Sequence, residues 1–181
     1  MSEELNIQDL YNEYTAASQV QEATSRPTVP GGTYRFIGQK ADLRFANERS
    51  PWPGRRIVTI QANLERDGQK KGTIFADLSV EKDETAFRTP GGKLDTPARL
   101  WGHVVAAFEQ DAKAPVLSKG EIVAMVTKYP LEATVQETFT IGEDGNGSRL
   151  YKSPKDEAER KSFFEQGFTA FNKVTSLRKV K

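Results

Sequence analysis

Residues 33–45 have the sequence TYRFIGQKADLRF, in which apolar and polar side chains alternate. A period of two is typical of a β-strand that buries one of its faces. The face predicted to be buried carries Ile37, Ala41, Leu43 and Phe45. The face predicted to point outward carries Tyr34, Phe36, Lys40 and Arg44, and Gly38 between them is a candidate for a bulge.

Two further strands are predicted after this one. The first has an alternating face of Arg56, Val58, Ile60, Ala62 and Leu64. The second points Ile74, Ala76, Leu78 and Val80 inward and Thr73, Phe75, Asp77 and Ser79 outward. Because Asp67-Gly68 is a turn signal between them, the three strands are expected to form an antiparallel meander.

The remaining segments add helices and two more strands. Thr96-Pro97 is a helix start, and the apolar stripe behind it consists of Leu100, Trp101, Val104, Val105 and Phe108. A short helix is predicted over 120–128, a fourth strand over 131–141 with Glu137 as its polar exception, and a helix from Ser153-Pro154 to Gly167. The last strand is predicted over 171–180, and an N-terminal helix carries Ile7, Leu10, Tyr11 and Tyr14.

This order predicts a mainly β fold with helical additions, namely a five-stranded OB-like barrel. One helical connection lies between strands 3 and 4, one helix precedes the last strand, and one helix is N-terminal. An SH3-like barrel or an open sheet with flanking helices fits the same order of elements. The expected domains are an N-terminal helix and linker, residues 1–28, and an OB-like domain, residues 29–181.

Composition excludes several kinds of site. The chain has 181 residues, no cysteine and one histidine, so disulfides, thiolate zinc sites and multi-histidine zinc centres are excluded. No apolar run reaches the roughly 20 residues of a membrane span. Since the N-terminus also lacks the pattern of a signal peptide, we expect a cytoplasmic protein with no membrane partner.

The net charge of +1 conceals an uneven distribution of charge along the chain. Residues 33–82 carry 10 basic and 6 acidic side chains, and residues 148–181 carry 9 and 4. Residues 1–32 carry 1 basic and 5 acidic side chains. A polyanion could bind this chain if the fold brings the two basic blocks onto one face.

Catalytic signatures are weak. The segment from Gly91 to Thr96 lacks the spacing of a phosphate-binding loop, and His103 is expected to be a structural histidine on a helix. A magnesium-dependent nuclease is a third option, with candidate ligands Asp42, Glu48, Asp77 and Glu137. We therefore expect no enzyme activity, no metal and no cofactor.

The loop sequence RSPWPGRR, residues 49–56, places Trp52 between two prolines and beside three arginines. An indole held in this way can stack on a base, while arginine can contact phosphate. The alternative is that Trp52 closes one end of the barrel. The outward aromatic side chains could likewise stack on bases, unless a helix covers them and makes them a second core.

Several stretches, taken in order, resemble bacteriophage single-stranded-DNA-binding proteins of OB fold from replication and recombination gene clusters. They are VPGGTYRF (29–36), PGRR (53–56), GTIFADL (72–78), ARLWGHVVAAF (98–108) and FNKV (171–174). The resemblance implies sequence-independent coating of single strands and no catalysis. Many such proteins end in an acidic tail that recruits partners, whereas this chain ends in LRKVK, residues 177–181. The acidic segment 1–32 is an alternative place for partner recruitment.

The leading expectation is therefore a protein that binds single-stranded DNA by stacking and phosphate neutralisation. The candidate binding residues are Tyr34, Phe36, Lys40, Arg44, Arg49, Trp52, Arg55, Arg56, Lys70, Lys71, Phe75, Lys173, Arg178 and Lys179. Further expected partners are phage or host replication and recombination proteins, and a homodimer is left open. The alternative function is a small protein-binding module that modulates a host or phage replication enzyme.

Overall fold

The computed structural model describes residues 27–80, 88, 91–108 and 118–181, and it shows a mainly β fold. The strands are β1 (Gly32–Phe45), β2 (Arg56–Arg66), β3 (Gln69–Ser79), β4 (Leu131–Glu143), β5 (Arg149–Lys152) and β6 (Thr169–Lys179). The helices of the described residues are α2 (Thr96–Phe108), α3 (Lys119–Lys128) and α4 (Glu157–Glu165). Apart from residues 27 and 28, the predicted N-terminal segment lies outside the described residues.

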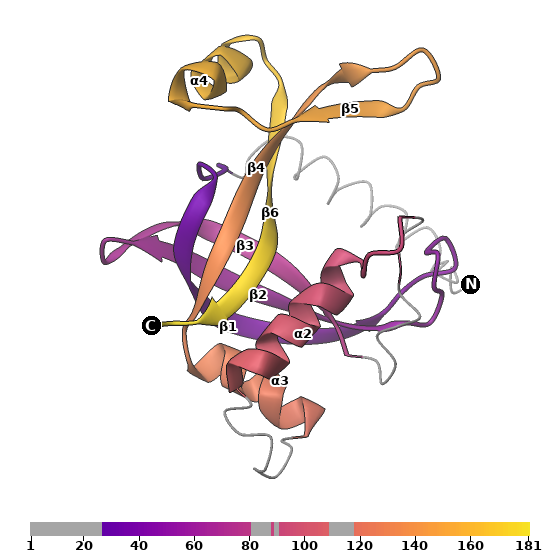
Figure 1. Cartoon of the computed structure of the whole chain (residues 1–181), viewed down its shortest axis with the longest axis vertical. Coiled ribbons are helices and arrows are strands. Elements are labelled where there is room, and N and C mark those ends of the chain that lie inside the picture. Colours follow the sequence, from indigo (N-terminus) through magenta and orange to yellow (C-terminus); the bar gives the residue numbers. More distant parts are fainter. Residues whose placement is uncertain (1–26, 81–87, 89–90, 109–117) are drawn as a thin grey trace, which may run out of the picture.

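The six strands form one antiparallel sheet in the order β3-β2-β1-β4-β5, with β6 off this path. One edge of β4 pairs first with β1 and then with β5, and the opposite edge pairs with β6. Within the described residues no ladder joins β3 to β6, so the sheet is not closed. The prediction of a mainly β fold with helical additions is confirmed. The expected count of five strands is wrong, because residues 149–152 add a short hairpin to the end of β4. Figure 1 shows this hairpin and α4 projecting beyond the rest of the sheet.

A bulge divides β1 into two halves with opposite side-chain phase. The pairing of β1 with β2 shifts register between Gly38 and Lys40, which leaves Gln39 as the extra residue. One extra residue turns every following side chain to the other face of the sheet. Glycine is required beside the bulge, because a Cβ on Gly38 would lie 2.5 Å from the backbone oxygen of Val126 in α3.

Because of the bulge, the predicted outward orientation of two aromatic residues is wrong. Tyr34 and Phe36 precede it and are buried, with 2% and 0% of their surface exposed. Beyond the bulge the predicted alternation holds, so Lys40 and Arg44 point outward. Leu43 and Phe45, predicted to be buried, are exposed because β4 pairs with β1 only as far as Phe36.

β2 and β3 bury the predicted apolar faces, with two exceptions. Arg56 is exposed at the start of β2, and Ser79 at the end of β3 is buried although it was predicted to point outward. Ser79 Oγ accepts a 2.7 Å hydrogen bond from Nε of Arg55, which is itself buried. The polar end of β3 is thus part of an internal hydrogen-bonded group.

α3 matches its predicted limits to within one residue, whereas α4 begins at Glu157, three residues after the predicted start at Ser153-Pro154. α2 packs against β3 and β6, and its cap is Asp95 rather than Thr96, because Asp95 Oδ1 accepts the Ala98 N–H. α3 has a reciprocal capping box between Ser118 and Glu121. α4 follows the N-cap Asp156. None of the described helices has the length and apolar composition needed to cross a membrane.

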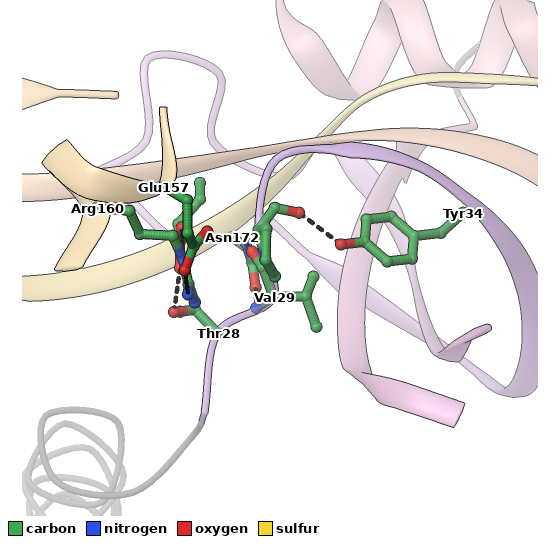
Figure 2. Close-up of polar contacts among 8 residues, drawn as sticks. Thr28, Val29, Tyr34, Glu157, Arg160 and Asn172 are labelled. Carbon is green, nitrogen blue, oxygen red and sulfur yellow. Dashed lines mark hydrogen bonds and ion pairs between the residues drawn. The ribbon is translucent and has the colours of Figure 1, made fainter. Parts of the chain in front are cut away.

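The segment before β1 fills the gap between β3 and β6. The backbone N–H of Val29 donates to Asn172 Oδ1, and Asn172 Nδ2 donates to the Val29 carbonyl, both at 2.8 Å. On the other side Val29 meets β3 at Gly72, where an added Cβ would lie 2.9 Å from its Cγ1. Figure 2 shows this segment between Asn172 and Tyr34, whose hydroxyl donates to the Pro30 carbonyl at 2.6 Å. The two strands are therefore joined through Val29 instead of through a ladder.

A buried ion pair holds α4 to β4. Glu137, the polar exception in β4, is 2% exposed and lies on the core face of the strand. Arg160 of α4 donates to both of its carboxylate oxygens, at 2.5 and 3.1 Å, and Thr28 donates to Oε1 at 2.5 Å. The hydrogen bond to Glu137 raises the pKa of Arg160, and Figure 2 shows Arg160 between Glu157 and Thr28. The carboxylate therefore tolerates burial because three donors satisfy it.

His103 joins α2 to β6, which confirms the prediction of a histidine on a helix. Its Nδ1 accepts the Leu177 N–H at 3.3 Å, so the bond requires an unprotonated nitrogen. Burial, and then the charge of Arg99, lower the pKa of His103 below the ordinary value of 6.5.

Replacing Arg160 by leucine should strongly destabilise the fold, because Glu137 would remain buried without its cation. The loss of one partner of a buried pair costs about 3–5 kcal/mol of unfolding free energy, measurable by urea titration. Glu157→Gln is the matched control: this carboxylate also contacts Arg160, at 3.2 Å, but its side chain is 73% exposed. That variant should lose at most about 1 kcal/mol. Equal losses in the two variants would contradict the proposed role of the buried pair.

Stability should fall as the pH falls below 6.5, because the unfolded chain then takes up a proton on His103 before the folded chain does. The melting temperature should therefore be lower at pH 5.5 than at pH 7.5. In His103→Asn, whose Oδ1 can accept the same N–H, the difference should shrink. A pH dependence that is identical in the two proteins would assign it to other groups.

Candidate nucleic-acid interface

Three adjoining hollows form a furrow along the junction of β3 and β6. The first, of about 280 Å³, is lined by Thr73–Phe75 of β3 and Ala170–Asn172 of β6. The second, of about 470 Å³, shares Phe75 and extends over Asp77 and Lys173 to the start of α2. The third, of about 370 Å³, shares Asp95 and Pro97 with the second and reaches the loop between β1 and β2. We call this continuous surface the β3–β6 furrow.

Aromatic side chains lie at one end of the furrow. Phe75 and Phe171 line the first hollow from opposite strands and are 42% and 41% exposed. Tyr151 of β5, which is 55% exposed, contacts Phe171 edge to face with 5.7 Å between the ring centroids. Exposed rings on adjacent elements offer successive flat surfaces on which unpaired bases can stack.

Trp52 lies at the other end of the furrow. Its ring is half-buried and lines the third hollow together with Arg44 and Arg55. The Arg55 guanidinium lies 5.2 Å from the centroid of the Trp52 ring. The indole therefore packs against a buried group and also presents part of its surface to the furrow. It has features of both predictions, the ring that stacks on a base and the ring that closes one end of the barrel.

Arg55 is not placed to contact phosphate, contrary to the prediction. It is 5% exposed, and its two terminal nitrogens donate to Asp95 at 2.5 and 2.8 Å. Together with the hydrogen bond from Arg55 Nε to Ser79, these bonds link the Trp52 loop to the start of α2 and to the end of β3. The fold uses this arginine to hold the Trp52 loop in place.

Besides the buried Arg55, the cations of the described residues that line the furrow are Arg44 and Lys173. Arg44 forms a 2.6 Å ion pair with Asp77 and donates to Thr59 Oγ1 at 3.1 Å, but half of its side chain remains exposed. Lys173 is exposed on β6. The furrow is thus more strongly aromatic than basic.

The other predicted cations lie outside the three hollows. Lys40 forms a 2.9 Å ion pair with Asp42 on the outer face of β1, and Arg178 near the end of β6 pairs with Glu132. The remaining predicted cations are exposed and are Arg49, Arg56, Lys70, Lys71 and Lys179. The two basic blocks of the sequence do meet where β3 faces β6, but most of their charges are spread over other surfaces.

A larger hollow, of about 520 Å³, lies between β4 and α4, but its chemistry is different. It includes Glu137 and Arg160, whose charges neutralise one another, and none of the described residues that line it is aromatic. The four carboxylates considered for a nuclease all lie in the described part of the chain. Within that part, no three acidic or histidine side chains gather closely enough to hold a metal ion.

Phe171, which lines the furrow, and Tyr151, which contacts Phe171 beside it, were not among the predicted site residues. Phe171 lies in a predicted strand, where alternation with the outward Lys173 is a signal that could have identified it. Tyr151 belongs to a four-residue strand between polar turn residues, too short for a periodic pattern. Its contact with Phe171 depends on β5 and β6 both pairing with β4.

Searches against protein-family models and against curated proteins find no match to this chain.

Proposed function

We propose that the protein binds single-stranded DNA without sequence preference along the β3–β6 furrow. The observation that carries this proposal is the series of rings along the furrow. Phe171 and Phe75 are exposed and line the first hollow, Tyr151 contacts Phe171 beside it, and the half-buried Trp52 lines the third hollow. Stacking of this kind tolerates any base, because every base has a flat face. Phage replication and recombination remain the proposed context, on the resemblance described above.

The strand order supports an OB-like fold for this function. If the short β5 is set aside, the order is β3-β2-β1-β4-β6, with β6 facing β3 and Val29 between them. An OB fold is a five-stranded, partly open barrel that binds oligonucleotides with strands 2 and 3 and with the loops after strands 1 and 4. Here those loops correspond to the Trp52 loop and to the arm formed by β5 and α4. We propose that the sheet is an OB barrel opened between β3 and β6.

The electrostatics favour a mode in which stacking contributes more than charge. Lys173 can neutralise a phosphate at the furrow, whereas the charges of Arg44 and Arg55 are already balanced by Asp77 and Asp95. An OB unit covers about 4–16 nucleotides, so the furrow would hold a short stretch of strand.

The alternative function is a protein-binding module that modulates a replication enzyme. The pairing of Lys40 with Asp42 and of Arg44 with Asp77 favours it, because an apolar peptide would use the exposed rings without needing positive charge. The two functions differ in whether a bare oligonucleotide binds.

The deciding measurement is fluorescence anisotropy with labelled oligo-dT and a matched duplex at two salt concentrations. We expect salt-sensitive binding of the single strand and much weaker binding of the duplex. Phe171→Ala should weaken binding, because each stacked base contributes about 1–3 kcal/mol, or roughly 5- to 150-fold in affinity.

Tyr129→Ala is the matched control for Phe171→Ala. Tyr129 is 46% exposed at the end of α3 and lines none of the three hollows, so this variant should bind as the unaltered protein does. Failure of the unaltered protein to bind oligo-dT at low salt would overturn the proposal and favour the protein-binding alternative. Equal losses in the two variants would remove the furrow as the site.

Trp52→Ala should weaken binding by a similar factor while the protein stays folded, because part of the indole faces the third hollow. Thermal melting followed by circular dichroism measures the second part of this expectation. A melting temperature lowered by many degrees would instead identify Trp52 as a support for Arg55.

A further inference from the structure

In the described part of the chain, the second half of β1 is an edge of the sheet that pairs with no other strand. β4 pairs with β1 only from Gly32 to Phe36, and within the described residues no strand pairs with the same edge from Ile37 to Phe45. Side chains on both faces are exposed from Asp42 to Phe45, among them Leu43 at 59% and Phe45 at 63%. An exposed strand edge with large apolar residues is a template for pairing with another strand.

The charges along this edge are complementary to a second copy of the same edge. In an antiparallel pair centred on Leu43 of both copies, Asp42 lies opposite Arg44 of the second copy, and Arg44 lies opposite the second Asp42. Within one chain Asp42 is already paired with Lys40 and Arg44 with Asp77, so the second copy would extend these ion pairs into a row of alternating charge. On the other face, Ala41 lies opposite the second Phe45, and the two Leu43 side chains meet on the two-fold axis. Opposite charges and apolar pairs in directly facing positions stabilise a sheet.

Neighbouring registers are less favourable. A pair centred on Asp42 places two aspartates face to face and Lys40 opposite Arg44, and a pair centred on Arg44 places two arginines face to face. Like charges in these positions are destabilising. A pair centred on Ala41 would match Lys40 with Asp42, but it extends to Gly38, where α3 lies against the strand, and sets Leu43 opposite the polar Gln39.

We propose that the protein forms a symmetric dimer by antiparallel pairing of β1 edges, centred on Leu43. The two-fold axis would run perpendicular to the sheet, so that β3-β2-β1 of one copy continues into β1-β2-β3 of the other. The outer faces of the two copies, including both Arg44 side chains, would then point the same way. The inference comes from the edge alone and does not depend on the proposed binding of DNA.

The absence of cysteine makes a single introduced cysteine a direct probe of this register. In Leu43→Cys, the facing Cα atoms of an antiparallel pair would be about 4.5–5.5 Å apart, within the range of about 4.4–6.8 Å for a disulfide. We expect mild oxidation to convert this variant into a covalent dimer on a non-reducing gel. Ala41→Cys should stay monomeric on the gel, because its two copies would be about 14 Å apart.

A mixture of Ala41→Cys with Phe45→Cys should form a cross-linked heterodimer, since these positions face each other. Sedimentation of the unaltered protein should show twice the chain mass, and Leu43→Asp, which places two carboxylates on the axis, should show a single chain. Leu43 is exposed, so this variant should keep the circular dichroism spectrum of the folded protein. A monomeric unaltered protein, or cross-linking of Ala41→Cys as readily as Leu43→Cys, would overturn the proposal. None of these measurements involves DNA, so their outcome is separate from that of the oligonucleotide titration.

Discussion

The extra residue in β1 is the constraint on which the rest of the structure depends. β1 is paired with both β4 and β2, so any change of its phase affects both halves of the sheet. The register shift between Gly38 and Lys40 allows Phe36 to enter the core before it and Lys40 to face outward after it. Because α3 lies against Gly38, the same point also positions the helical connection that leads into β4.

Polar contacts connect the parts of the fold that the ladders leave apart. The amide of Asn172 bonds both backbone groups of Val29 and so joins the segment before β1 to β6. The carboxylate of Glu137 joins β4, α4 and the same segment through Arg160 and Thr28. Each buried side-chain nitrogen and oxygen atom of the described residues has a hydrogen-bond partner, which is the condition under which such groups stabilise a unique arrangement.

The β3–β6 furrow is a consequence of this mode of closure. Two strands that were hydrogen-bonded to each other would leave no hollow between Phe75 and Phe171. With Val29 between them instead, their outer side chains flank a surface that extends to the start of α2. Arg55, buried against Asp95, connects that surface to the Trp52 loop. In the proposed DNA site, the ion pair of Arg55 with Asp95 thus supports the Trp52 loop, while the exposed rings of Phe75 and Phe171 lie on β3 and β6.

The sequence by itself determined the elements that bury one face along a regular pattern. The core faces of β2 and β3, the stripe of α2, the limits of α3 and the end of α4 follow from periodicity, caps and glycine, which act within a few residues. Gly38 was a candidate for a bulge in the sequence, but only the tertiary structure decided the phase of β1 on either side of it, since the extra residue shows in the pairing with β2. It also decided the burial of Arg55, whose partner Asp95 lies 40 residues away, and the meeting of Tyr151 with Phe171. A local pattern carries no information about such partners, because they come together only when the sheet is assembled.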